Sequence, residues 1–261
     1  MKRAPYIEVV VSTLNDGIDC LQLNENFHYL IIHQVTTREK QERYDQIVHS
    51  IQHPNFRYIR SYSGGLSKSR NIGLKNSQGD YVWIMDDDVL LLEGAEDQIS
   101  NFLIDNDSVD LFILNYTSDD RRERCYVNDA VIKKMNSISV ASVASINMLI
   151  KKSSVSNIKF DEKFGLGTQY PSGEEYIFCC DLLQQDKTIV QTNLVVSYHP
   201  LETSGQDFYT TPLKLIAKKK MFIRGNGFLK GYLLFIAFLL KKWRVLTKNK
   251  AYLNIIKALV R

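Results

Sequence analysis

The stretch that decides the fold is GDYVWIMDDDV, residues 79–89. Its bulky apolar run, residues 81–85, predicts a buried strand. That strand ends abruptly in three carboxylates, Asp86, Asp87 and Asp88. Two explanations fit such adjacent negative charges. They cap a solvated turn, where aspartate is common, or they converge on a hard divalent cation, which prefers oxygen ligands.

Working outward, strands alternate with helices over the first 120 residues. Strands are predicted at residues 6–16, 27–35, 56–63, 81–85 and 109–117, and helices at 39–53, from an N-cap at Ser67, and after residue 91. This alternation predicts an α/β domain with a mostly parallel sheet flanked by helices. Ligands bind beyond the carboxyl ends of such strands, so residues 12–15 and the three aspartates are expected at one edge.

Beyond residue 120 the pattern is looser. Strands are predicted from residue 139 onward and at 188–200, and residues 159–185 read as a long loop that runs into a helix. Long loops in compact domains tend to carry function. The four cysteines form no C-x-x-C pair, which indicates reduced thiols in a cytosolic protein.

Charge divides the chain into two parts. Residues 208–261 hold 13 of the 33 Lys and Arg residues and no Asp or Glu, which leaves 20 basic and 29 acidic residues in 1–207, a net charge of −9. We therefore expect a catalytic domain over 1–207 and a basic helical extension over 208–261. Such an extension favours a polyanionic partner, either nucleic acid or an anionic membrane.

The extension contains a ten-residue apolar run, GYLLFIAFLL, at 231–240. As a helix this run is roughly 15 Å long, too short to span about 30 Å of hydrocarbon. Apolar residues then recur at helical spacing among lysines over 250–261, which predicts a basic amphipathic helix at a membrane surface. The alternative is a helical cap, with residues 232–240 buried against the domain. The apolar residues do not interleave with arginine as a stacking surface would, so we expect no nucleic-acid partner.

Three further segments carry candidate chemistry. SGGLSKSRN, residues 63–71, offers a helix N-terminus and cations for phosphate, although, taken alone, an ordinary connection with solvated cations is the favoured explanation. GEEY, residues 173–176, offers a general base, although acids at a helix N-terminus need no function. His199 ends a strand that faces the aspartates and is a candidate metal ligand.

In this order, the segments resemble glycosyltransferase family 2, inverting enzymes with a GT-A (Rossmann-like) fold, over about residues 6–205. The specific part is G-x-S-x-x-R-N followed by G-D-Y and D-x-D. The resemblance implies Mn²⁺- or Mg²⁺-dependent transfer of a hexosyl or N-acetylhexosaminyl group. The donor would be a UDP-, GDP- or dTDP-linked sugar and the acceptor a hydroxyl group.

The resemblance also implies roles for individual residues. By position, Thr13, Asn15, Arg70 and Asp86 would hold the donor. Asp86, Asp88 and His199 would hold the metal ion. Glu175 would be the catalytic base, with Glu174 as the other candidate, because the pair Glu174–Glu175 replaces the family's usual Glu-Asp. Gln34 occupies the position where the family commonly carries an acidic residue that recognises the nucleobase of the donor.

The basic extension places the expected enzyme at the cytoplasmic face of the cell membrane. Its expected acceptor is a saccharide, such as a polyprenyl-linked one, in bacterial capsule or O-antigen synthesis. Two alternatives belong to other classes: a nucleotide-sugar-binding protein without catalysis, and a nucleic-acid-binding protein that uses the basic extension.

Overall fold

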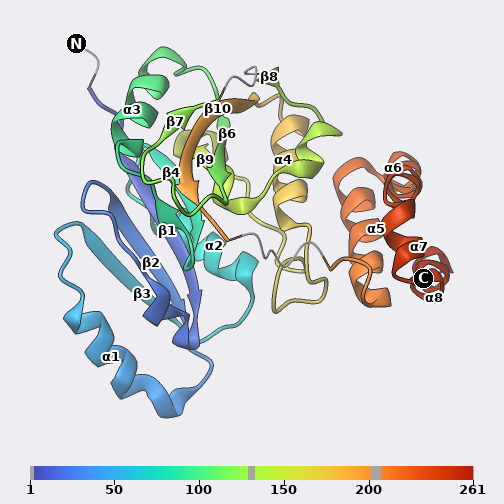
Figure 1. Ribbon diagram of the computed structural model, residues 1–261, viewed down its shortest axis with the longest axis horizontal. Helices are drawn as coiled ribbons and strands as arrows, with labels where there is room; N and C mark the ends of the chain where they lie inside the picture. The colour runs from blue at the N-terminus through green and yellow to red at the C-terminus, as the bar shows by residue number, and fades with distance from the viewer. Residues whose placement is uncertain (1–2, 129–132, 201–206, 261) are drawn as a thin grey trace.

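The computed structural model describes residues 3–128, 133–200 and 207–260, which form one large sheet, flanking helices and a helical C-terminal lobe (Figure 1). The strands are β1 (Ile7–Leu14), β2 (His28–Gln34), β3 (Phe56–Ser61), β4 (Tyr81–Asp86), β5 (Leu90–Leu91), β6 (Leu111–Thr117), β7 (Tyr126–Val127), β8 (Lys133–Lys134), β9 (Met148–Lys151) and β10 (Ile189–Tyr198). The helices are α1 (Gln41–Ser50), α2 (Leu66–Asn76), α3 (Ala95–Asp105), α4 (Glu174–Gln184), α5 (Pro212–Asn226), α6 (Phe228–Lys241), α7 (Trp243–Lys248) and α8 (Tyr252–Val260).

The sheet is mixed and mostly parallel, as the sequence predicts. Its order is β3-β2-β1-β4-β9-β6-β10-β5, and β7 and β8 also pair with β10. Strands β3, β2, β1 and β4 run parallel, as do β6 and β10. Strand β9 is antiparallel to both of its neighbours and so separates the two parallel groups.

Both faces of the sheet are covered, which explains the continuous apolar runs in β1 and β4. Val10 and Ile84 point to one face and belong to an apolar cluster that includes residues of α4 and α5. Val11 and Met85 point to the other face and pack in a cluster with Ile99 of α3. Alternate residues of one strand thus join different cores, and the strands are held in a fixed register.

The strand predicted from residue 139 begins only at Met148. The preceding residues form two short 3₁₀ turns, Ser139–Ser142 and Ser145–Asn147, because their backbone groups bond within the turns instead of to a neighbouring strand. Trp83 of β4 holds the second turn, since its indole nitrogen donates to the carbonyl oxygen of Ile146 at 2.8 Å. The prediction of strand there was therefore wrong, and the turns lie beside the site described below.

Helices α5 to α8 form the C-terminal lobe at the right of Figure 1. Helix α5 contacts α4 on one side and α6 and α8 on the other. Phe235 and Leu239 of α6 are buried in the apolar cluster that also contains Val10 of the sheet. The inner faces of the lobe therefore extend the main core. In the described residues, every helix falls short of the length and apolar content that crossing a bilayer demands.

Candidate functional site

A cavity of about 820 Å³ opens where β1 and β4 end. These strands are parallel neighbours, and Ser12 lies opposite Asp86 in their register. The two polar strand ends therefore share one edge of the sheet, as predicted. The cavity is lined by Ser12–Leu14, Gln34, Thr36, Gly64–Leu66, Arg70, Asp86–Asp88, Tyr116, Val143–Ile146, Leu166–Gly167, Pro171–Glu175, His199 and Lys218.

The three aspartates have different surroundings. Asp86 accepts a hydrogen bond from Arg70 at 3.1 Å, while Asp88 is exposed and faces His199. Asp87 turns back toward β1: a Cβ on Gly17 would lie 2.2 Å from its Oδ2 and 2.7 Å from Oγ1 of Thr13. Burial and the charges of its two neighbours raise the pKa of Asp87. This carboxylate therefore packs under the turn, and glycine at position 17 makes room for it.

Arg70 joins three elements of the site. Its side chain is 1% exposed, and Nη1 donates to Oε1 of Glu174 at 2.9 Å. Nη2 donates to Asp86 and to the hydroxyl of Ser145 at 2.7 Å. Although burial opposes its charge, the surrounding carboxylates raise the pKa of Arg70. The guanidinium group thus ties the end of β4 to the start of α4 and to the turn at Ser145.

The two glutamates at the start of α4 differ in their exposure and in their distance from Arg70. Glu174 is 4% exposed and pairs closely with Arg70, whereas Glu175 is 20% exposed and lies 3.6 Å from Nη1 of that residue. Burial and the charge of Glu174 raise the pKa of Glu175 from 4.5 to about 7, although Arg70 opposes the shift. A carboxylate with this pKa is suited to accept a proton near neutral pH.

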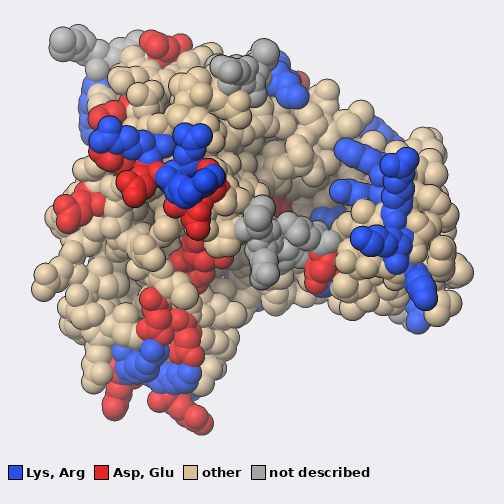
Figure 2. Space-filling view, in the orientation of Figure 1, with Lys and Arg blue, Asp and Glu red and all other residues tan. Residues whose placement is uncertain are grey.

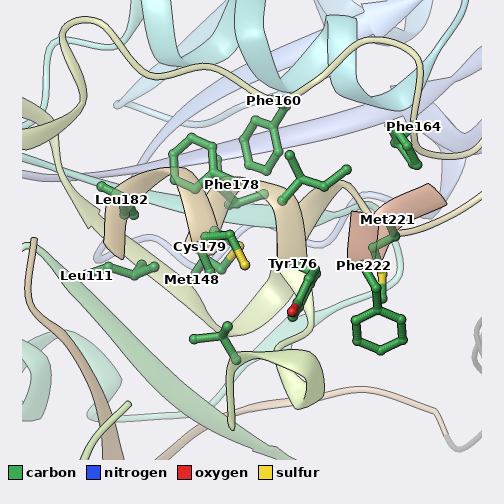
Figure 3. Packing of buried hydrophobic residues seen from close by; sticks show 14 of the residues in the cluster. Leu111, Met148, Phe160, Phe164, Tyr176, Phe178, Cys179, Leu182, Met221 and Phe222 are labelled. Carbon is green, nitrogen blue, oxygen red and sulfur yellow. The ribbon is translucent and has the colours of Figure 1, made fainter. Parts of the chain in front are cut away.

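Packing fixes the helix that carries this pair. Phe178 of α4 stacks on Phe160 with ring centroids 4.4 Å apart, and Tyr176 makes an edge contact with Phe222 of α5 (Figure 3). Gly173, just before α4, has φ of +109°, and a Cβ there would lie 2.7 Å from Met221. The start of α4 is therefore held between the 160–164 segment and α5.

His199 and Asp88 face each other across the cavity rim. Nδ1 of His199 is 2.7 Å from the carbonyl oxygen of Pro200, and a carbonyl only accepts, so Nδ1 carries the proton. In the neutral ring Nε2 then presents its lone pair, and it lies 3.5 Å from Oδ1 of Asp88. A nitrogen lone pair next to a carboxylate oxygen is a pair of donors suited to a divalent cation.

The predicted third ligand, Asp86, pairs with Arg70. Across residues 3–128, 133–200 and 207–260, no three His, Cys, Asp or Glu side chains gather closely enough to hold a metal ion by themselves. Among the described residues, the donor set therefore fits a cation as a two-residue partial shell, with room for oxygen atoms of a ligand.

The SKSRN segment fastens the loop over residues 159–172 to the sheet. Helix α2 begins at Leu66 with Gly65 at its N-cap, so the predicted N-cap at Ser67 was wrong. The Ser67 hydroxyl instead donates to the carbonyl oxygen of Phe164 at 2.5 Å. Asn71 donates to the carbonyl oxygen of Phe160 and accepts from its amide at 2.9 and 2.8 Å. These contacts hold one wall of the cavity in place.

Of the residues expected to hold the nucleotide, Thr13 and Gln34 line the cavity, whereas Asn15 does not. Thr13 lines the cavity, and its buried hydroxyl lies beside the carboxylate of Asp87. Asn15 is not one of the lining residues: its amide nitrogen donates to Thr36 at 2.8 Å and its carbonyl oxygen accepts from the Thr36 amide. Gln34 lines the cavity and donates to the carbonyl oxygens of Ser63 and Gly65.

Two lining residues near the glutamates, Ser145 and Lys218, were not predicted from the sequence. Ser145 reaches Arg70 from a segment predicted as strand. Lys218 enters from α5, in the extension assigned above to a membrane. Its only signal in the sequence is a place among three consecutive lysines, which looks like a solvated patch.

Comparisons with known proteins agree with this geometry. The model of the family "Glycosyl transferase family 2" matches residues 3–157, more than half of the 261-residue chain. The poly(ribitol-phosphate) beta-N-acetylglucosaminyltransferase TarP of Staphylococcus aureus is 30% identical over 139 residues, which cover 51% of this chain and 40% of that protein. The minor teichoic acid biosynthesis protein GgaB of Bacillus subtilis is 27% identical over 124 residues, 43% of this chain and 13% of that protein. The chain thus spans less than half the length of these relatives.

Solved structures share the fold. TarS of S. aureus (residues 1–349, with UDP) superposes with a TM-score of 0.57 at 14% identity, over 90% of this chain and 72% of that one. A mannosyltransferase from Pyrobaculum calidifontis with GDP-Man and Mn²⁺ gives 0.58 at 15% identity, over 99% and 75%. The predicted GT-A architecture is confirmed.

Proposed function

The chain belongs to glycosyl transferase family 2, and from this premise we propose that it transfers a sugar from a nucleotide-diphosphate sugar to an acceptor hydroxyl, with inversion at C1. One observation carries the proposal. A partly exposed carboxylate with a pKa of about 7, Glu175, lines the same cavity as the facing pair Asp88 and His199.

The donor site extends along the carboxyl ends of β1 and β4. Thr13 lines this part of the cavity and offers its hydroxyl to a nucleotide there. Solved relatives of the same fold hold UDP, UDP-GlcNAc or GDP-Man, which supports a nucleotide-sugar donor here. Asn15 supports this end from outside the cavity by bonding the segment after β2. The donor sugar is expected to be a hexose or N-acetylhexosamine.

Asp88 and His199 would hold Mn²⁺ or Mg²⁺, with diphosphate oxygens completing the shell. When bound, such a cation neutralises charge that builds up on the leaving diphosphate. Asp86 contributes differently, since its carboxylate fixes Arg70 and one side of the donor cavity. The mannosyltransferase neighbour contains Mn²⁺, which supports this choice of ion.

Glu175 would take the proton from the attacking hydroxyl. Glu174 is already committed to Arg70 at 2.9 Å, so of the two glutamates Glu175 is the one with an oxygen open to an acceptor. The hydroxyl attacks C1 from the face opposite the diphosphate, which inverts the configuration and requires no covalent intermediate. Arg70 holds Glu174 beside the base, and the negative charge of Glu174 helps keep the pKa of Glu175 high.

The acceptor is expected to be a cell-surface polymer or its lipid-linked precursor. The relatives TarP and GgaB are named for poly(ribitol-phosphate) and minor teichoic acid. Synthesis on a lipid carrier would place the protein at the cytoplasmic face of the membrane, peripherally bound.

The C-terminal lobe has the composition of a membrane-binding surface. Lys and Arg gather on its visible face in Figure 2, whereas acidic and basic residues mix over the sheet domain. The lobe also leaves large apolar side chains exposed: Phe228, Leu229, Leu233 and Leu240 on α6, Trp243 on α7, and Leu253, Ile256 and Val260 on α8. Exposed apolar side chains among cations suit the interface of an anionic bilayer.

The transfer reaction is tested with a panel of UDP-, GDP- and dTDP-linked sugars, each incubated with Mn²⁺, Mg²⁺ or EDTA. Release of nucleotide from one donor, abolished by EDTA, is the expected result. Nucleotide binding without release from any donor would indicate a non-catalytic binding protein and would overturn the proposal.

Membrane binding is tested separately by flotation with phosphatidylglycerol vesicles. The wild-type chain should float with them, and Leu233→Glu/Leu253→Glu should float less. Ile47→Glu, on the half-buried face of α1 away from the lobe, serves as a control for general damage. Wild-type chain that stays at the bottom of the gradient would contradict the membrane assignment.

A further inference from the structure

We infer that the cavity binds a phosphate group of the acceptor through Lys218, so that the acceptor hydroxyl belongs to a phosphorylated molecule. This inference rests on the proposed function, because it takes Glu175 as the base and therefore its surroundings as the acceptor end. Lys218 lies on α5, beyond the residues 3–157 that match the family model, yet it lines the same cavity as the glutamates.

Lys218 differs from the other cation of the cavity in its partners. Arg70 has three carboxylates within 4.0 Å. Lys218, in contrast, forms neither an ion pair nor a hydrogen bond with any residue that the structure describes. Its half-buried side chain nevertheless faces a cavity with five lining carboxylates. A half-buried ammonium without a partner is costly, and a bound anion would offset that cost.

The electrostatic neighbours of Lys218 place it at the acceptor end. Burial lowers the pKa of its ammonium group, and the charges of Glu175 and Glu174 oppose that shift. Helix α5 packs against α4, which begins with these two glutamates, so Lys218 lies near the proposed base. An anion held by Lys218 would be part of the molecule that carries the attacking hydroxyl.

A basic surface continues outward from this position. Lys242, after α6, lies close enough to Lys218 that its charge disfavours the ammonium form. The lobe beyond carries the remaining cations of a segment that has 13 Lys and Arg residues and no acidic ones. An acceptor with repeated negative charges could extend along this surface and present one hydroxyl at Glu175. Two sources share this chemistry: a polyol-phosphate chain and a lipid-linked diphosphate.

The test measures acceptor binding in the presence of Mn²⁺ and UDP, so it needs no turnover and no identified donor sugar. Probes are ribitol 5-phosphate, a short-chain polyprenyl-diphosphate saccharide, and ribitol as the neutral reference. Charge-assisted hydrogen bonds contribute about 1.5–3 kcal/mol, so Lys218→Met should weaken binding of a phosphorylated probe about 10- to 150-fold. Lys218→Arg should restore most of it. Lys220 lies on the same helix but does not line the cavity. Lys220→Met removes an equal charge and should leave the affinity for the phosphorylated probes unchanged.

The probe that loses affinity identifies the source of the phosphate. Wild-type affinity for both phosphorylated probes in Lys218→Met would overturn the inference, as would failure of the wild-type chain to bind either probe. If Lys218 only modifies Glu175, then Lys218→Met will shift the pH profile of transfer equally for neutral and phosphorylated acceptors. Absence of donor turnover with intact Lys218-dependent phosphate binding would refute the proposed reaction and leave the phosphate site standing.

Discussion

Nη1 of Arg70 lies 2.9 Å from Oε1 of Glu174, a residue 104 positions further along the chain. This contact gives the two adjacent glutamates different roles. Glu174 forms an ion pair with Arg70, whereas Glu175 remains partly exposed to the cavity. The second amino group of Arg70 reaches Asp86 at 3.1 Å. One buried guanidinium therefore fixes the distance between the metal-binding end of the proposed site and its base.

Arg70→Met should destabilise the fold strongly. Removing one member of a buried ion pair leaves an uncompensated charge on Glu174 and costs about 3–5 kcal/mol. Urea denaturation at pH 7.5 measures the free energy of unfolding. Lys68→Met, on the same helix but without an ion pair to a described residue, is the matched control and should change it by about 0.5 kcal/mol or less. Equal effects of the two substitutions would mean that Arg70 is not the structural link described here.

Glu175→Gln and Glu174→Gln should have opposite signatures. Loss of a general base typically lowers the transfer rate about 10²- to 10⁴-fold, so Glu175→Gln should lower kcat by this factor while donor binding stays intact. Glu174→Gln should chiefly lower stability, because it weakens the pair with Arg70. Measurement of kcat, donor affinity and unfolding free energy for both variants separates the two roles. The reverse pattern would assign the base to Glu174.

The transfer rate should depend on pH through Glu175. Its pKa of about 7 means that the carboxylate is protonated, and inactive as a base, below this pH. The rate should therefore fall about tenfold per unit as pH decreases below 7. A pH profile measured with saturating donor tests this, and a flat profile between pH 5.5 and 8 would contradict it.

Glu175 should also make the stability of the fold depend on pH: as pH rises, the transfer rate should increase whereas the stability should decrease. The folded chain holds this proton more tightly than the unfolded one, whose glutamate titrates near 4.5. Stability from this residue is therefore greatest below pH 4.5 and is lost as pH rises toward 7. Thermal unfolding of the wild type and of Glu175→Gln across this pH range isolates the contribution of Glu175 to stability. The variant should lack the decrease in stability that Glu175 causes between pH 4.5 and 7.

His199→Ala should weaken Mn²⁺ binding. Loss of a residue that merely supports a metal ligand costs about 10- to 100-fold in affinity, so loss of a ligand should cost at least as much. Electron paramagnetic resonance of Mn²⁺ in the presence of UDP gives the affinity. His49→Ala removes an exposed histidine of α1 that does not line the cavity, and should have no effect. Unchanged affinity in His199→Ala would remove His199 from the metal site.

Much of the site could be predicted because it lies at strand ends. Parallel neighbours bring their carboxyl ends to one edge, so the apolar runs before Asn15 and Asp86 were enough to predict that these segments meet. Even so, Asn15 bonds to Thr36 and is not a cavity-lining residue, which strand position alone cannot reveal.

The remaining features depend on partners distant in the sequence. The hydroxyl of Ser67 looks like a helix cap, but a carbonyl 97 residues away takes its hydrogen bond. Lys218 looks like part of a solvated lysine run, and its place in the cavity lining depends on the packing of α5 against α4. Local patterns predict elements, whereas side-chain partners follow from how the elements pack.

The central claim is that the end of β4 holds a cation needed for sugar transfer. The most direct measurement is Mn²⁺-dependent nucleotide release from the active donor by Asp88→Ala, compared with Asp105→Ala, an exposed aspartate at the end of α3. Stabilisation of the leaving group by a metal ion contributes several kcal/mol, so Asp88→Ala should lose about a hundredfold or more while Asp105→Ala matches the wild type. Full activity and unchanged metal dependence in Asp88→Ala would contradict the account.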